Sequence, residues 1–153
     1  MPTIEPNEVE SVITTRIARL PATEHAQDIP SATWSETSTI GELDSGNTAA
    51  VHLLFAVAVS GVPASPLAAQ YADSASVRSR LVVEFFYRLR ATKQTDDARS
   101  AWNAARQVRR AVMRAPDPRF AVILVDAGRV FDNTQDGVRL IQQQFDVIHD
   151  VEV

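Results

Sequence analysis

The chain has 153 residues, a formal net charge of −4 and no cysteine. This length suits one domain, which buries roughly 70% of the surface that its unfolded chain exposes, so we expect a single domain over residues 1–153. The lack of cysteine excludes disulfides, thiol catalysis and thiolate metal sites. The negative charge provides no long-range attraction for nucleic acid, although a local surface can still be basic.

The sequence shows neither an export signal nor a membrane span. Three acidic residues, Glu5, Glu8 and Glu10, stand near the amino terminus, where a secretory signal is first basic and then apolar. The longest apolar stretch, residues 49–59, is about half of the ~20 residues that cross a bilayer. We therefore expect no membrane contact.

A first helix is expected over residues 6–20. Pro6 suits a first helical turn, and apolar side chains then recur at helical spacing as far as Pro21. Residues 21–47 are rich in Thr, Ser, Ala, Pro and Gly, which is typical of a long loop with room for a short strand near 32–34. Trp34 is expected to anchor this loop to the core.

Two strands are predicted next. Apolar side chains alternate with smaller ones over residues 51–59, and Gly61 with the prolines after it ends this strand and begins a second loop, over about 61–76. The alternation is clearest over 77–91, where one face is apolar and must meet a core. The opposite face combines basic and apolar side chains: Arg78, Arg80, Val82, Glu84, Phe86, Arg88 and Arg90.

The pattern of residues in the carboxy-terminal half predicts a second helix and two further strands. Thr95, Asp96 and Asp97 suit a helix start, and an apolar stripe that includes Trp102 continues as far as Pro116. The remaining elements are a buried strand over 120–125, a turn over 126–128, a second turn over 132–137 and a final strand from 138. This order predicts an α+β fold in which a mostly antiparallel or mixed sheet carries two main helices on one face.

The sequence contains no pattern of a catalytic, cofactor or metal site. The histidines, His25, His52 and His149, are far apart and lack the spacing of metal ligands. Residues 132–137 resemble the start of a calcium loop, but the twelfth position is Gln143 instead of a bidentate glutamate. The five glycines form no phosphate loop and no Gly-x-Ser-x-Gly elbow. An enzyme would require distant His and Asp residues to converge, so we expect a protein without catalytic residues, cofactor or metal.

The basic strand face leaves two alternatives. Its arginines can contact phosphate, which would make the chain a nucleic-acid-binding accessory protein that uses Arg78, Arg80, Arg88 and Arg90. They can also meet another protein, because arginine is favoured at protein interfaces, and nucleic-acid modules usually carry more positive charge and exposed aromatic platforms. We favour the protein interface and assign these candidate residues to it: Arg78, Arg80, Glu84, Phe86, Arg88, Arg90 and Trp34.

The order of elements resembles the tail terminator (tail completion) proteins of long-tailed phages and of phage-derived particles. The resemblance lies in the helix over 6–20, the strand Ser79-Arg80-Leu81-Val82-Val83-Glu84-Phe85-Phe86, the helix that begins Thr95-Asp96-Asp97, and the closing strand Phe145-Asp146-Val147-Ile148-His149-Asp150-Val151-Glu152-Val153. Closely related neck proteins have the same location in the particle. The sequence departs from the family in the loop over 21–47 and in the proline-containing insertion after Gly61.

The resemblance implies a non-enzymatic virion protein of the tail or neck, assembled in the host cytoplasm. Members of the family form a hexameric ring that caps the finished tail tube, stops its polymerisation and provides a docking surface for the neck or head. The implied partners are further copies of the same chain, the tail tube protein, neck or head-completion proteins, and genomic DNA that passes through the ring without sequence-specific binding.

Overall fold

The computed structural model describes residues 2–21, 33–37, 52–59, 74–90, 92–114, 117–133 and 137–152. Along the chain its elements are α1 (Pro6–Ala18), β1 (Ser35–Glu36), β2 (Leu54–Val59), β3 (Ser74–Arg88), α2 (Gln94–Met113), β4 (Phe120–Asn133) and β5 (Val138–Glu152). His25 and most of the two predicted loops lie outside the described residues. The predicted short strand near 32–34 is found slightly later, as β1.

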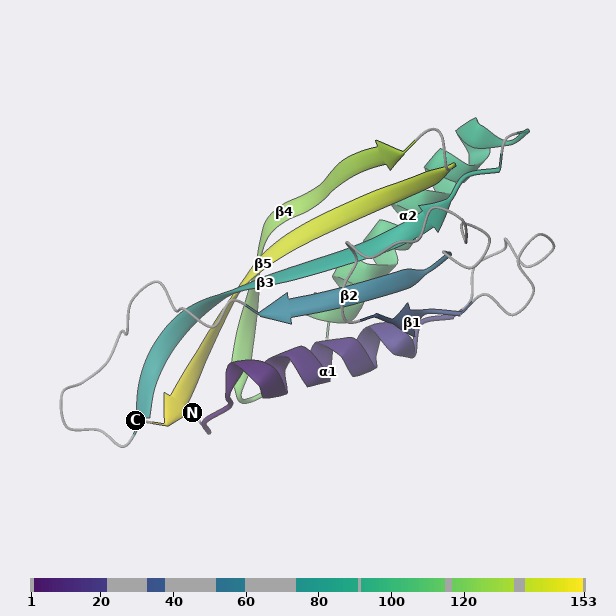
Figure 1. Cartoon of the computed structure of the whole chain (residues 1–153). Coiled ribbons are helices and arrows are strands. Elements are labelled where there is room, and N and C mark those ends of the chain that lie inside the picture. Colours follow the sequence, from purple (N-terminus) through teal and green to yellow (C-terminus); the bar gives the residue numbers. More distant parts are fainter. Residues whose placement is uncertain are drawn as a thin grey trace.

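One mixed sheet of five strands organises the molecule, in the order β1-β2-β3-β5-β4 (Figure 1). β1 runs parallel to β2, and every other neighbouring pair is antiparallel. The two longest strands, β3 and β5, pair with each other along their whole length in the middle of the sheet. The predicted α+β fold is therefore confirmed.

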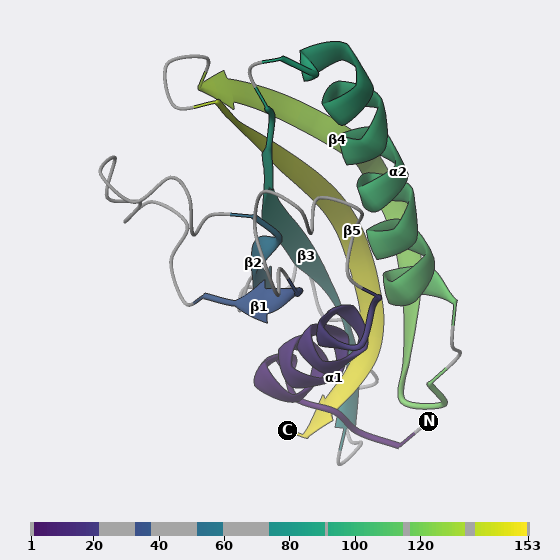
Figure 2. The same ribbon diagram turned by 90° about the vertical axis from the view of Figure 1, so that its right-hand side faces the viewer.

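Both helices pack on the same face of this curved sheet (Figure 2). Val9, Ile13 and Ile17 of α1 enter the same buried cluster as Ala101 and Val108 of α2. From β3 and β5 the cluster takes the inward-facing residues Leu81, Val83, Phe85, Tyr87, Ile141, Phe145 and Val147. The period of two predicted for residues 77–91 is confirmed, because these inward residues of β3 alternate with the mixed basic and apolar face.

The amino-terminal segment is tied to the carboxy-terminal strand. Thr3 bridges to Asp150, and the Ile4 N–H donates to the Asp150 carbonyl at 2.8 Å. The His149 ring, fully buried, contacts the Ile4 carbonyl through Nδ1 at 2.8 Å and the Ser79 hydroxyl through Nε2 at 2.9 Å. Since a carbonyl only accepts, Nδ1 donates to Ile4, and in the neutral ring Nε2 accepts from the Ser79 hydroxyl. This histidine joins three segments of the fold.

Strand β4 differs from the prediction. We expected a buried strand over 120–125 and a turn over 126–128. Residues 120–125 do form a strand, but most of its side chains are exposed, and the predicted turn is wrong. One strand continues to Asn133, and its register with β5 shifts between Leu124 and Asp126 and again between Asp126 and Arg129. Residues 126–128, which were predicted to form a turn, lie in these β-bulges instead. A bulge accommodates an extra residue in one strand without ending the pairing.

Three further local predictions are corrected. Strand β3 begins at Ser74 and ends at Arg88, so Arg90 lies beyond it. His52 precedes β2 instead of lying within it. Trp102, expected on the buried stripe of α2, is 43% exposed, whereas Asp97 is buried. The burial of Asp97 is explained by its ion pair with Arg90. A pattern of hydrophobicity alone does not reveal such a pair.

Candidate interaction surfaces

The sheet face opposite the helices carries the basic side chains predicted on β3. Arg78 and Arg80 both donate through Nε to the carboxylate of Asp146 on β5, at 2.9 and 2.8 Å. A second contact joins Arg80 to Gln144, at 2.9 Å, and Gln142 donates to Glu84 at 2.6 Å. The predicted interface residues are thus brought together, but in a network in which one carboxylate balances two guanidinium groups.

Next to this network the same face is apolar. Phe86 on β3 and Val138 on β5 form a small buried cluster, with Leu54, Ala56 and Leu140 packed against it. This cluster is separate from the main core because the sheet lies between the two. The outer face therefore has one polar and one apolar half.

The other predicted interface residues are placed differently. Trp34 is 4% exposed and its ring lies 5.3 Å from the ring of Phe85, so it belongs to the core of this chain, as its expected anchoring role requires. The side chain of Arg90 is bound to Asp97. The backbone N–H of Arg88 donates to His52 Nδ1 at 3.2 Å. Trp34 and Arg90 therefore do not form one patch with Arg78 and Arg80, whereas Arg88 follows Phe86 by two residues in β3 and lies on the same sheet face.

An exposed apolar surface on β4 was missed by the sequence prediction. Strand β4 is an edge of the sheet, and it exposes Ile123, Leu124, Val125 and Phe131 by 43%, 38%, 45% and 49%. We call these four residues the β4 edge surface. The run Ala121-Val122-Ile123-Leu124-Val125 was the available signal, but a continuous apolar run indicates burial without saying which molecule provides it.

The bulged part of β4 is held by polar contacts. The Ala127 carbonyl accepts from Gln143 Nε2 at 2.9 Å and from Arg109 Nη1 at 3.1 Å. Asp126 accepts from the Gly128 N–H and from Arg129 Nε, each at 3.0 Å. Gln143, fully buried, also donates to the carbonyl of Ala105 in α2. The β4 edge surface is therefore presented on a fixed backbone.

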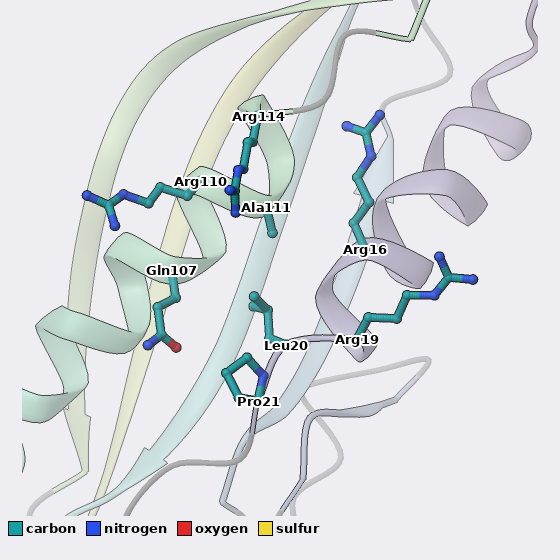
Figure 3. A pocket seen from close by; sticks show the side chains of 8 residues that line it. All are labelled: Arg16, Arg19, Leu20, Pro21, Gln107, Arg110, Ala111 and Arg114. Carbon is teal, nitrogen blue, oxygen red and sulfur yellow. The ribbon is translucent and has the colours of Figure 1, made fainter.

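A cleft lies between the carboxy-terminal ends of the two helices (Figure 3). Its volume is about 420 Å³. Leu20, Pro21 and Ala111 lie at its centre, and four arginines surround them. The lining residues are Arg16, Arg19, Leu20, Pro21, Gln107, Arg110, Ala111 and Arg114. We call this the arginine cleft.

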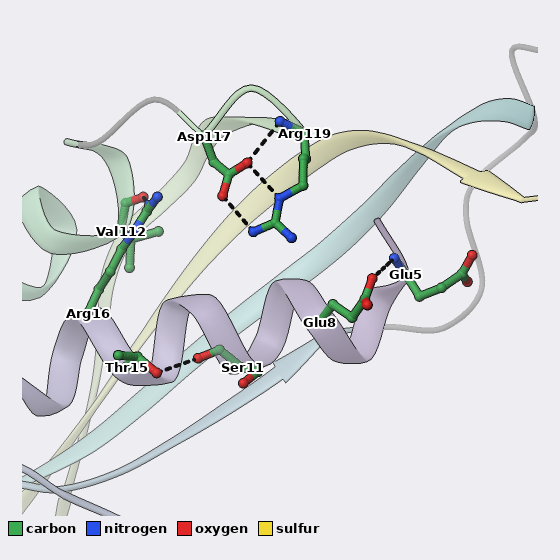
Figure 4. A network of polar contacts seen from close by, with 8 residues as sticks. All are labelled: Glu5, Glu8, Ser11, Thr15, Arg16, Val112, Asp117 and Arg119. Atoms are coloured by element: carbon green, nitrogen blue, oxygen red, sulfur yellow. Dashed lines mark hydrogen bonds and ion pairs between the residues drawn. The ribbon is translucent and has the colours of Figure 1, made fainter. Parts of the chain in front are cut away.

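Arg16 connects the two helices beside this cleft. Its Nη1 donates to the Val112 carbonyl at 3.1 Å, and its guanidinium group lies 5.6 Å from the centre of the Phe120 ring. Burial lowers the pKa of Arg16, and the nearby carboxylate of Asp117 opposes that shift. Hydrogen bonds from Arg119 lower the pKa of Asp117 in turn (Figure 4). Arg16 is therefore a structural member of the cleft.

The described residues contain no candidate metal site. No three His, Cys, Asp or Glu side chains gather where they could hold a metal ion within this part of the chain. The arginine cleft and a second hollow of about 290 Å³, beside Leu124, are lined without histidine. Neither described helix has both the length and the apolar composition that crossing a lipid bilayer requires.

The surfaces of the molecule thus fall into three groups: the outer sheet face, the β4 edge surface and the arginine cleft. Comparison with models of protein families and with curated proteins found no match to this chain.

Proposed function

We propose that this chain is a non-enzymatic structural subunit that assembles with copies of itself into a ring. In this proposal the ring caps a phage tail tube, ends the polymerisation of the tube and joins the tail to the neck or head, while genomic DNA passes through its opening. The order of elements that resembles the tail terminator proteins supports this assignment. The observation that carries it is the β4 edge surface.

An exposed apolar edge strand is unfavourable for a chain that stays alone. Its unpaired N–H and C=O groups can pair with another strand, and soluble monomers normally protect such edges with charge, proline or a covering loop. Ile123, Val125 and Phe131 instead expose large apolar side chains on this edge. Large apolar side chains exposed along an unpaired sheet edge are typical of a protein–protein contact.

The two edges of the sheet differ in a way that suits a directed assembly. At the opposite edge β1 has only two residues, whereas β4 has 14. One long edge therefore provides most of the backbone groups with which a neighbouring molecule can pair. The outer sheet face, with the small cluster around Phe86, is a second surface for the tail tube or neck protein.

The test is the size and shape of the purified full chain. We expect light scattering to give a mass of several copies and electron microscopy to show rings with an opening. Ile123→Lys with Val125→Lys should yield single copies, because each ammonium group would have to be buried in the contact. Gln94→Lys with Thr95→Lys adds the same charge at exposed positions at the start of α2 and should leave the ring intact.

Two results would overturn the proposal. One is a wild-type chain that stays a single copy at its highest soluble concentration and shows no ring by microscopy. The other is normal assembly of the Ile123→Lys, Val125→Lys variant. Circular dichroism of each variant shows whether its fold is retained.

A further inference from the structure

The arginine cleft concentrates positive charge in a chain whose net charge is −4. Four of its eight lining residues are arginines, and none is acidic. Arg19, Arg110 and Arg114 are exposed and make no ion pair within the described part of the chain. Within this part of the chain, the charge at the rim is therefore available to another molecule.

The shape of the cleft favours a protein over a nucleic acid. Leu20, Pro21 and Ala111 form an apolar centre, and the side chains of Arg19 and Arg110 extend away from it on opposite sides (Figure 3). A sugar–phosphate backbone presents mainly charged phosphate oxygens and polar sugar oxygens, so it covers such an apolar centre poorly. An acidic protein surface with an apolar side chain among its carboxylates matches both the centre and the rim.

The chain itself carries a surface of this kind at its other end. Glu5 and Glu8 lie at the start of α1, and the Glu152 N–H donates to Glu5 Oε1 at 3.2 Å, so Glu152 lies beside them. All three acidic residues are exposed, with exposed Pro2 and half-buried Val151 close by in the sequence. We call Glu5, Glu8 and Glu152 the acidic end.

The acidic end cannot neutralise the cleft of its own chain. Glu8 and Arg19 are 11 residues apart along α1, which corresponds to roughly 16 Å at ~1.5 Å per residue. This separation is about twice the screening length of ~8 Å at physiological salt. The acidic end of a neighbouring copy is not held at this distance from the cleft. Contacts between unlike ends of identical subunits produce a closed ring when the rotation from each subunit to the next adds up to a full turn.

We propose that the arginine cleft binds the acidic end of a second copy of this chain. The inference rests on the proposed ring, and it names a contact between neighbouring subunits beyond the β4 edge surface. Each subunit provides one cleft and one acidic end. Every contact around the ring is then the same, and all clefts are filled.

The experiment exchanges the charges of the two surfaces. Variant A carries Arg110→Glu and Arg114→Glu, and variant B carries Glu8→Arg and Glu152→Arg. We expect each variant to weaken assembly at least about tenfold, because like charges then face each other. The chain with all four substitutions should assemble again, since its two ends are once more opposite in charge.

Restored assembly separates a direct contact from damage to the fold. Glu8 belongs to the capping box of α1, and Arg110 lies in the last turn of α2, so either variant can lose stability. Adding a second pair of destabilising changes cannot repair a fold. Lys93→Glu with Arg99→Glu makes the same charge change at the other end of α2 and should leave assembly unchanged.

The outcomes distinguish this inference from the proposed function. A wild-type chain that forms no ring overturns both. A ring that forms equally well with variants A and B overturns the cleft contact alone, as does a four-substitution chain that stays dissociated. Retention of a mixed-sequence double-stranded DNA by the wild type, lost in variant A while its ring persists, would assign the cleft to nucleic acid instead.

Discussion

Arg90 and Asp97 form the most buried ion pair among the described residues. Asp97 accepts the backbone N–H of Arg90 at 2.6 Å and its guanidinium nitrogens Nε and Nη2 at 3.1 and 2.9 Å. The Asp97 side chain is 1% exposed. One buried carboxylate therefore fixes the connection between β3 and α2, which places the helix on the sheet.

Replacing Asp97 should be costly. Asp97→Ala leaves the Arg90 guanidinium and its backbone N–H without this partner in a mostly buried place, so we expect a loss of about 3 kcal/mol in the free energy of unfolding. Asp96→Ala, at the exposed neighbouring position, should cost less than about 1 kcal/mol. Urea denaturation of both variants measures the difference. Equal losses in the free energy of unfolding would show that the buried ion pair stabilises the fold no more than the exposed Asp96 does.

Gly128 and Trp102 should be energetically coupled. A Cβ atom at position 128 would lie 3.0 Å from Trp102 Cζ3 and 3.6 Å from Ile141 Cγ2, so the indole ring must move. We expect Gly128→Ala to cost about 1–2 kcal/mol and to shift the fluorescence of Trp102. In a Trp102→Ala background the cost should nearly disappear. An unchanged cost in that background would contradict the contact.

Asp117 should contribute to stability above the acid range. Hydrogen bonds from Arg119 lower its pKa in the folded chain, so the contribution is fully present above the pKa of an unfolded aspartate. It is lost as the pH falls through the lowered folded value. Asp117→Asn should therefore flatten the fall in stability on acidification, measured as melting temperature against pH. Asp96→Asn is the control, and an equal flattening there would contradict the assignment.

His149 should hold the amino-terminal segment on the sheet. His149→Leu leaves the Ile4 carbonyl and the Ser79 hydroxyl without their buried partner, which should cost about 3 kcal/mol. Ser79→Ala removes only one of the two contacts and should cost about 1 kcal/mol. Hydrogen exchange of the Ile4 amide should accelerate in His149→Leu. A rate equal to that of the wild type would show that this tether is dispensable.

Local patterns predicted the type of most elements. Alternation over 77–91 assigned Leu81, Val83 and Phe85 to one face, because successive side chains of a strand point to opposite sides whatever the strand pairs with. Helical spacing likewise identified Val9, Ile13 and Ile17 as the buried side of α1. Both regularities depend only on neighbours in the chain.

Local sequence patterns did not predict the positions of the interaction surfaces. Asp146 neutralises Arg78 and Arg80 only because β5 pairs with β3 in one particular register. The apolar run of β4 is exposed only because β4 is the last strand of the sheet. A sequence pattern shows that a side chain is apolar, but not whether its own chain supplies the atoms that cover it.

The sequence by itself determined the α+β class, the two-sided character of β3 and the anchoring of Trp34, since these depend on periodicity and on the size of an aromatic ring. Only the tertiary structure decided that Arg90 belongs to Asp97, that β4 forms an edge, and that the arginines of α1 and α2 surround one cleft. Those relationships join residues that are distant in the chain, and strand order and helix packing bring them together.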